Sequence, residues 1–208
     1  MTDKKKLPQG WKWVKLGRMG KLTQGGTPST DNAEYWNGDI PFITGADVTD
    51  LFVSGARSFL TAKGLESGKS QECEEGDLII VSRTRVGRVG IAAVKLSVSQ
   101  DVSVIKLENG YHNTYIALYL LSLSQYLQES SQGAVIKGLT RGFIENIEIP
   151  IPPTFEEQMR IAAELEEKRI VIEQLRQAVR RQLGAVEAMP AAAMREAFGF
   201  DMNAEATN

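Results

Sequence analysis

The chain contains few of the residues that build disulfides, metal sites and nucleophilic active sites. Among its 208 residues there is one cysteine, Cys73, and one histidine, His112. A single cysteine excludes an intrachain disulfide framework and a cysteine-based zinc site. A single histidine excludes histidine clusters for metals and most pairings of a nucleophile with a histidine base, so we interpret His112 as a surface residue. We expect no metal site and no catalytic residues in this chain.

Long apolar runs and a strong net charge are also absent. No stretch of about 18 apolar residues and no signal peptide occurs, so we expect a cytoplasmic protein without a membrane span. The net charge of −2 does not by itself indicate a nucleic-acid partner. The charges are unevenly placed, because residues 1–153 hold 17 basic and 16 acidic side chains whereas 154–208 hold 7 and 10. The two parts are therefore expected to have different partners.

A change from strand to helix is predicted near residue 153. Alternating apolar residues run to Ile151 and are typical of a last strand, while prolines at 150, 152 and 153 exclude a helix there. Thr154 can then cap a helix that begins after it. We therefore expect a globular domain at 1–153, a helical region at 154–200 and a flexible tail at 201–208.

The helical region carries the repeat of a coiled coil. Its apolar positions follow alternating steps of four and three, interrupted at Lys168 and Gln182, and Pro190 is expected to end or kink the helix near Met189. The alternative is an amphipathic helix that packs on its own domain. About 35 residues at about 1.5 Å each make a rod of about 50 Å, which outreaches such a domain, so we favour pairing with a partner helix. The proposed pairing residues are Ile161, Leu165, Ile172, Leu175, Val179 and Val186.

The globular part is predicted to be α+β and rich in strands over its first two thirds. Short apolar runs separated by Gly, Asn and Asp have the length of strands. These runs are 40–43, 77–81, 89–94 and 102–107. From Asn113 to about Ser131 the apolar residues share one helical face, and Gly133 stands where a C-cap would. We therefore expect an α+β domain followed by a long coiled-coil helical arm.

Three glycine-containing loops offer groups that contact a polyanion. The segment 25–30, Gly-Gly-Thr-Pro-Ser-Thr, has backbone N–H groups and hydroxyls that can hold phosphate oxygens, although a plain loop is equally consistent. The segment 82–90 places three arginines among small residues, and an arginine fork pairs with phosphate or with the edge of guanine. The segment 133–142 is a third basic loop just before the last strand. The basic residues of these loops are Arg83, Arg85, Arg88, Lys137 and Arg141.

Short motifs run through the chain in a definite order. They include Leu7-Pro-Gln-Gly-Trp11, Gly25-Gly-Thr-Pro-Ser-Thr30, Glu34-Tyr-Trp-Asn-Gly38, Ile40-Pro-Phe-Ile43, Ile149-Pro-Ile-Pro-Pro153 and Glu157-Gln158. Each motif is weak alone, but in this order they resemble the DNA specificity subunit of type I restriction-modification systems over nearly the whole chain. In that family a target recognition domain is followed by a conserved helix, and the usual subunit has two of each in tandem. This chain has one of each.

The resemblance implies that the domain reads one half of a bipartite, gapped site in double-stranded DNA, while paired helices from two units set the gap. It also implies methyltransferase subunits that clamp around the helices, and an endonuclease subunit that joins them. S-adenosylmethionine and ATP/Mg would bind to those partners, with no cofactor in this chain. With one recognition domain, we expect a homodimer and a gapped palindrome. The candidate DNA contacts are Thr27, Ser29, Thr30, Lys69, Arg83, Arg85, Arg88, Gln100, Lys137 and Arg141.

Two functions from other classes remain as alternatives. A coiled-coil adaptor with a β-rich head that binds protein or sugar fits the acidic pI of about 5.6 and would not bind DNA. A nuclease or methyltransferase fragment is the third candidate, but the chain has no Asn/Asp-Pro-Pro-Tyr/Phe tetrapeptide of an amino-methyltransferase. DNA binding with steep salt dependence separates the first function from the adaptor, and methyl transfer by the chain alone would indicate the third.

Overall fold

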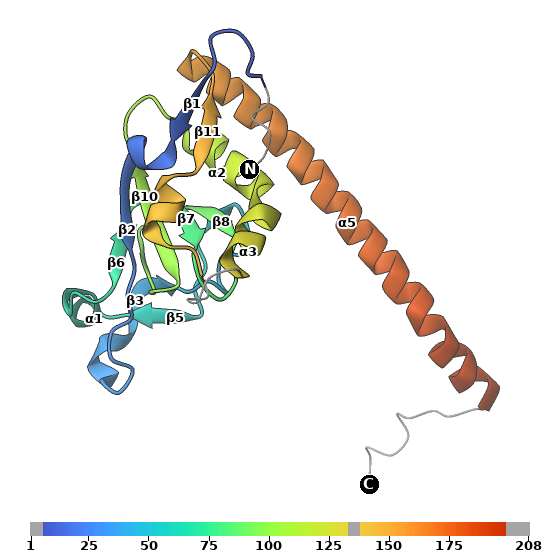
Figure 1. The fold of residues 1–208 in the computed structure, drawn as a ribbon. Coiled ribbons are helices and arrows are strands. Elements are labelled where there is room, and N and C mark those ends of the chain that lie inside the picture. The colour runs from blue at the N-terminus through green and yellow to red at the C-terminus, as the bar shows by residue number, and fades with distance from the viewer. Residues whose placement is uncertain (1–5, 133–137, 199–208) are drawn as a thin grey trace. The chain divides into compact units, whose positions relative to one another are not determined.

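The computed structural model describes residues 6–132 and 138–198, with side chains at 6–131 and 138–189. The chain separates into two compact units, Met1–Ala163 and Glu164–Asn208. The first unit mixes strands and short helices, and one long helix runs on into the second, so the predicted fold class is confirmed (Figure 1). Within the described residues, no helix is long and apolar enough to cross a membrane.

The described strands of the first unit form three sheets. The strands are β1 (Lys12–Lys15), β2 (Gly20–Gln24), β3 (Trp36–Ile43), β4 (Phe52–Val53), β5 (Ser58–Leu60), β6 (Gln71–Cys73), β7 (Leu78–Val81), β8 (Val89–Ala92), β9 (Leu96–Val98), β10 (Val102–Leu107) and β11 (Glu148–Ile151). The largest sheet has the order β2-β10-β7-β8-β4, the second has the order β5-β3-β9-β6, and β1 pairs with β11. Strands β3, β7, β8 and β10 confirm the four runs predicted from the sequence.

The largest sheet is the middle layer between two apolar cores. Successive side chains of a strand point to opposite faces, so Leu78 and Ile80 of β7 enter one core while Ile79 and Val81 enter the other. Helices complete the first core, and strands of the sheet β5-β3-β9-β6 complete the second. Burial on both faces explains why β7 reads as an uninterrupted apolar run.

Two helices stand where one helix was predicted over 113–131. They are α2 (Asn113–Ser122) and α3 (Ser124–Gln132). The predicted apolar face is confirmed, because Tyr115, Leu120 and Leu127 are all buried in the first core. The predicted C-cap, Gly133, lies outside the described residues. The shorter helical turns are η1 (Leu16–Arg18), η2 (Ala33–Tyr35), α1 (Ala62–Glu66) and α4 (Arg141–Glu145).

The predicted change from strand to helix near residue 153 is confirmed. Strand β11 ends at Ile151, and α5 (Phe155–Phe198) begins directly after Thr154. The Thr154 Oγ1 accepts a hydrogen bond from the Glu157 N–H at 3.1 Å, as expected of an N-cap. Helix α5 continues past Pro190. The expectation that Pro190 ends the helix is therefore wrong. Proline removes only one backbone donor, and the helix extends on both sides of it.

The first turns of α5 belong to the domain. Gln158 is 2% exposed, its Oε1 accepts from the His112 N–H and its Nε2 donates to the Gly110 carbonyl, both at 3.0 Å. The ring of Phe155 lies 5.5 Å from that of His112. His112 is therefore not a simple surface residue: it is half-buried, and its Nδ1 accepts from the Tyr115 N–H at 3.3 Å to cap α2. Burial lowers the pKa of His112 below its ordinary value.

Candidate nucleic-acid interface

Loops that are far apart in the sequence converge at one end of the large sheet. The carbonyl of Asp101, just before β10, accepts from the Ser82 N–H of the loop after β7 at 2.8 Å. Gly25, after β2, donates its N–H to the Val102 carbonyl at 3.0 Å. Leu139, before α4, donates to the Ser82 carbonyl at 2.8 Å. The described parts of all three predicted loops therefore meet at one place.

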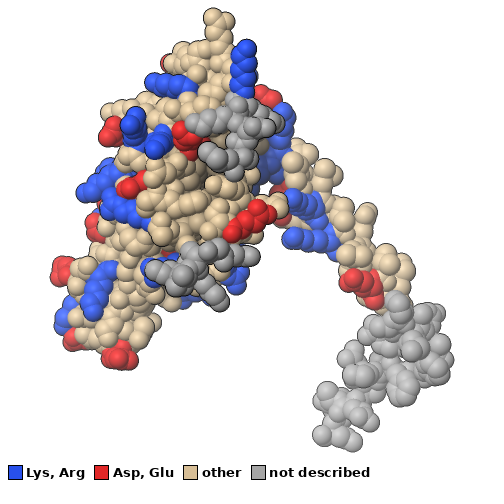
Figure 2. All heavy atoms as spheres, in the orientation of Figure 1, with Lys and Arg blue, Asp and Glu red and all other residues tan. Residues whose placement is uncertain are grey.

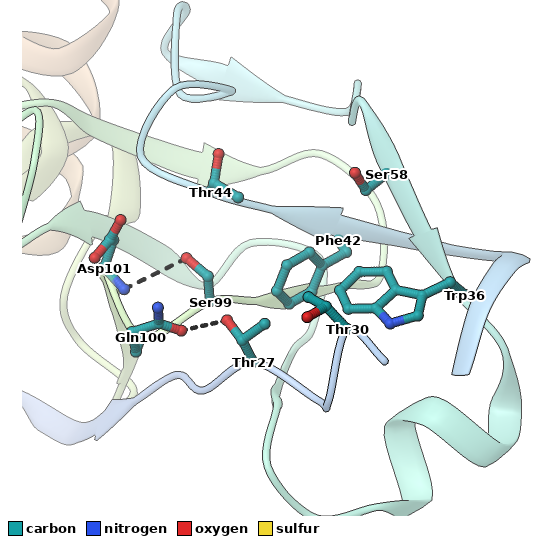
Figure 3. A pocket seen from close by; sticks show the side chains of 9 residues that line it. All are labelled: Thr27, Thr30, Trp36, Phe42, Thr44, Ser58, Ser99, Gln100 and Asp101. Atoms are coloured by element: carbon teal, nitrogen blue, oxygen red, sulfur yellow. Dashed lines mark hydrogen bonds between the residues drawn. The ribbon is translucent and has the colours of Figure 1, made fainter. Parts of the chain in front are cut away.

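An open hollow of about 370 Å³ lies between the predicted loop at 25–30 and the start of β10 (Figure 3). One wall is aromatic, because Trp36 meets Phe42 edge-on with ring centroids 5.3 Å apart. The Trp36 Nε1 donates to the Ser29 carbonyl at 3.0 Å, which fixes the loop to this wall. Toward β10, the Thr27 hydroxyl donates to the Gln100 Oε1. The lining residues are Thr27, Thr30, Trp36, Phe42, Thr44, Ser58, Ser99, Gln100 and Asp101.

The arginine loop is the turn that joins β7 to β8. Arg83 and Arg85 are exposed, and between them Thr84 has a φ of 57°, a left-handed conformation that is uncommon for a residue with a branched Cβ. The Thr84 Oγ1 bonds to the Arg83 carbonyl at 2.8 Å and to an Asp101 carboxylate oxygen at 3.3 Å. These bonds hold the strained turn against Asp101, one of the residues that line the hollow.

The base of the arginine loop is packed into the domain. Gly87 has a φ of 89°, and a Cβ there would lie 2.6 Å from the Ser124 carbonyl oxygen, so only glycine fits against α3. Arg88 is half-buried, and its Nη1 donates to the Val48 carbonyl at 3.1 Å. Of the three predicted arginines, Arg88 therefore anchors the loop, whereas Arg83 and Arg85 are exposed.

A charged pair fixes the turn that follows β3 at the edge of the hollow. The Arg57 Nε donates to Asp47 Oδ1 at 2.6 Å, and Asp47 Oδ2 accepts from the Thr44 N–H at 2.9 Å. The Asp47 side chain is 4% exposed. Burial acts to raise the pKa of Asp47, but the hydrogen bonds from Arg57 and Thr44 outweigh it and leave this pKa below its ordinary value. The carboxylate therefore remains ionised at neutral pH and holds the turn.

The remaining residues predicted to contact DNA are Lys69, Arg141 and Lys137. Lys69 is exposed, and its backbone lies so close to Gly26 that a Cβ on Gly26 would stand 1.7 Å from the Lys69 carbonyl oxygen. Arg141 is exposed at the start of α4 and donates from Nε to the Glu145 carboxylate at 2.7 Å. Lys137 lies outside the described residues.

Cys73 does not offer a reactive thiolate. It is fully buried, and burial raises the pKa of its thiol to about 12. In the part of the chain that the structure describes, no group of His, Cys, Asp and Glu side chains is placed to hold a metal ion.

Known proteins are similar to this chain along most of its length. The family described as Type I restriction modification DNA specificity domain matches residues 8–178. The chain belongs to this family. The Type I restriction enzyme MjaIX specificity subunit of Methanocaldococcus jannaschii is 32% identical over 170 residues, which are 79% of this chain and 39% of that protein. The EcoR124I/EcoR124II specificity subunit of Escherichia coli is 24% identical over 156 residues, or 72% and 38%.

Solved structures share the fold of this specificity domain. A chain from a study of complex assembly and conformational transition of the type I R-M system matches with a TM-score of 0.76 at 24% identity, over 95% of this chain and 48% of that one. The crystal structure of the HsdS subunit from Thermoanaerobacter tengcongensis matches with a TM-score of 0.68 at 24% identity, over 86% and 42%. The chain spans less than half the length of each of these relatives.

The specificity domain has a second basic surface that the sequence analysis missed. Lys21 and Lys106 are exposed and lie directly opposite each other in the antiparallel pair of β2 and β10. Arg18 is exposed in the neighbouring η1, and Figure 2 shows basic side chains over η1 and β2 with acidic side chains between them. Like charges in opposite positions repel. No sequence pattern could have indicated this pair, because only the strand register brings the two lysines together.

The long helix of the specificity domain carries an exposed apolar stripe. Five of the six predicted pairing residues are between 42% and 61% exposed. They are Leu165, Ile172, Leu175, Val179 and Val186. Ile161 differs, because it is half-buried and packs against the first core of the domain. Leu183 is 55% exposed and was missed. It lies next to Gln182, four residues after Val179 and three before Val186, so it adds an apolar side chain beside the position where Gln182 interrupts the stripe, without keeping the alternation of four and three.

Proposed function

We propose that this chain recognises a specific sequence in double-stranded DNA, as the specificity component of a type I restriction-modification complex. One observation carries the proposal: an exposed arginine loop and a hollow lined by hydroxyl and amide groups lie together at one end of the large sheet. Arginines supply phosphate contacts that position a protein on DNA, and neutral polar groups read base edges. Membership of the specificity-domain family supports the same function.

In this proposal the domain reads one half of a gapped site. The exposed stripe on α5 pairs with the helix of a second unit, in a homodimer whose two-fold axis produces a gapped palindrome. The curated relatives are more than twice as long as the part of them that matches this chain. That length leaves room in the relatives for a second unit of the same kind, which supports recognition by two units.

The chemical steps belong to partner subunits in this proposal. Methyltransferase subunits dock on the paired helices, bind S-adenosylmethionine and flip the target adenine out of the duplex. An endonuclease subunit that uses ATP and Mg joins the complex. The specificity chain supplies recognition and no catalytic group, and the complex works in the cytoplasm.

The salt dependence of DNA binding tests the proposal. In the double variant Arg83→Ala/Arg85→Ala, the slope of log K against log salt concentration should fall by roughly two units, one for each lost phosphate contact. Arg88 is retained because it anchors the loop. The matched control is Lys63→Ala/Lys95→Ala, which removes the same charge from side chains that pair with glutamates elsewhere on the domain.

Each outcome of that experiment has a distinct meaning. An unchanged salt slope in the arginine variant would remove the loop from the DNA site. Wild-type protein that shows no salt-dependent binding to any duplex would contradict the proposed function and favour the adaptor alternative.

A charge in the apolar stripe tests the pairing. Leu175→Glu should lower the mass of the assembly in sedimentation equilibrium, because a desolvated carboxylate in the helix interface has no counter-ion. The control Gln177→Glu adds the same charge to an exposed position of α5 outside the stripe. If Leu175→Glu keeps its mass with and without a methyltransferase subunit, the stripe is not the pairing surface. Methylation mapped to two unlike half-sites would contradict the homodimer.

A further inference from the structure

The hollow beside the arginine loop is unsuited to phosphate. None of its nine lining residues is lysine or arginine, and one of them is the carboxylate Asp101. A negative charge at the edge repels phosphate, and neutral hydroxyls alone offset little of the charge of a phosphate group. A ligand that is polar, uncharged and partly aromatic suits this lining better. The exposed edge of a nucleobase has these properties.

Gln100 is the lining side chain that is best prepared to make a specific contact. It is exposed, and its backbone is fixed because its carbonyl accepts from the Gln24 Nε2 at 2.7 Å. Its side chain is held as well, since the Thr27 hydroxyl donates to Oε1 and turns the amide oxygen toward Thr27 (Figure 3). Among the described residues, none accepts from Gln100 Nε2. A side chain that is already oriented loses less conformational entropy when it binds.

The free groups of this amide match one base better than the others. Nε2 is a donor, and Oε1 keeps a second lone pair as an acceptor after it binds the Thr27 hydroxyl. In the major groove adenine presents the N7 acceptor beside the N6 amino donor, and a glutamine amide pairs with both. Guanine presents two acceptors there and cytosine a single donor, so neither uses both groups of the amide. The serine and threonine hydroxyls of the hollow can act either way and do not discriminate.

The aromatic wall adds an apolar contact to the same hollow. Trp36 is half-exposed, is packed edge-on against Phe42 and has its Nε1–H occupied by the Ser29 carbonyl. Its ring therefore offers only apolar surface to a ligand. The thymine that pairs with adenine carries a methyl group in the major groove, and this methyl suits the wall.

We propose that Gln100 reads an adenine edge in the major groove, with Thr27 as its positioning residue, while Arg83 and Arg85 hold the flanking phosphates. This assignment rests on the proposed function, because it names the base contact within a DNA site. The loop that carries both arginines touches the hollow directly: the Arg83 N–H donates to the Asp101 carbonyl at 3.2 Å. The proposal thus assigns the phosphate contacts to Arg83 and Arg85 and the base contact to Gln100, on neighbouring loops.

Selection of binding sites from a randomised duplex library tests the assignment. The full chain is used, alone and with its methyltransferase subunits. Gln100→Ala should relax the preference at one A·T position by roughly 5- to 150-fold and leave the other positions and the salt slope unchanged. Thr27→Val should relax the same position by a smaller factor, because the amide loses its orientation. The control Gln125→Ala removes an exposed glutamine from α3 and should change nothing.

Three other outcomes would overturn the assignment, and they are distinguishable. If wild type selects a sequence and Gln100→Ala selects the same one with equal strength, Gln100 is not a reading residue. If the preference relaxes at a G·C position, the adenine assignment is wrong. If wild type binds without any preference, the proposed function itself fails. Thermal unfolding of each variant checks that the domain is intact, as expected for substitutions of solvent-accessible side chains.

Discussion

Leucine side chains are buried in the domain but exposed on the long helix. In the domain, Leu120 and Leu127 are fully buried, whereas Leu175 of the helix is 61% exposed. Burial of a leucine side chain contributes about 1.5–3 kcal/mol, so the domain obtains this stabilisation from its own chain. The helix can obtain it only from another surface. The domain thus buries its leucines against its own chain, whereas the exposed stripe on α5 has no such cover within the described residues and supports the proposed pairing with a partner.

The same substitution in the two regions should give the largest contrast. Leu120→Ala should destabilise the domain by about 2–5 kcal/mol, because it leaves a cavity in a packed core. Leu175→Ala should change the unfolding of the domain by less than about 0.5 kcal/mol, because it removes no contact within it. Urea unfolding of dilute protein, monitored by tryptophan fluorescence, measures both. An equal loss in the two variants would show that the stripe is packed on its own domain.

The boundary between the two regions can be probed at Gln158. Gln158→Ala should cost about 1–3 kcal/mol, because it removes two partly buried hydrogen bonds, to the His112 N–H and the Gly110 carbonyl, of about 0.5–1.5 kcal/mol each. Gln177→Ala makes the same change at an exposed position of α5 and should have no effect on the domain. Equal unfolding midpoints for the two variants would mean that the first turns of α5 do not stabilise the domain.

Acid should weaken the same junction through His112. The pKa of His112 is lowered in the folded state by burial, whereas the unfolded chain has the ordinary value of 6.5. Below about pH 6.5, His112 therefore binds a proton more readily in the unfolded state than in the folded state. This contribution to stability is fully present above that pH, and it is lost as the pH falls through the lowered folded pKa.

His112→Asn isolates this effect, because asparagine caps a helix and does not titrate. Wild type should lose more stability than His112→Asn between pH 7 and pH 5, as measured by thermal unfolding in matched buffers. Parallel profiles would show that His112 does not contribute to the acid sensitivity of the domain.

The smallest expected effect concerns the domain surface. Lys21→Ala should raise stability by about 0.2–1 kcal/mol, because it removes the repulsion with Lys106 across the strands. If this surface contacts DNA phosphates, the salt slope of binding should fall by roughly one unit at the same time. Lys12→Ala is the control, because Lys12 faces Ile151 across its strand pair. A loss of stability in Lys21→Ala would contradict the repulsion.

The parts of the fold that the sequence predicted are those with local causes. Prolines at 150, 152 and 153 and a capping threonine place the start of α5 because they act on their own backbone. The predicted strands, β3, β7, β8, β10 and β11, are runs long enough to show an apolar pattern. Strands such as β5 and β9 were missed, because three residues do not establish a period. The break between α2 and α3 was also missed, since both helices keep their apolar residues on the core side.

The sequence predicted the separate loops of the candidate site, but it did not predict that these loops meet in the folded domain. Arg83, Arg85 and Thr27 were identified by the chemistry of their loops, and Gln100 was named only together with the family resemblance. Nothing in the sequence indicated that these segments meet around Asp101. The role of Arg88 as an anchor depends on Val48, which approaches it only in the folded domain. Trp36 and Ser58 were not among the predicted contacts, because their place in the hollow follows from the packing of β3 and β5.

The amino-acid sequence by itself determined the strand-to-helix boundary, the apolar stripe and the arginine-rich loop, since each depends on neighbouring residues and on a fixed repeat. The tertiary structure alone decided which loops form the hollow, which lysines face each other and that His112 joins α2 to α5. Those relations depend on strand register and on packing between distant segments. A shift of one residue in register would turn every side chain of a strand to the other face, so no local pattern specifies them.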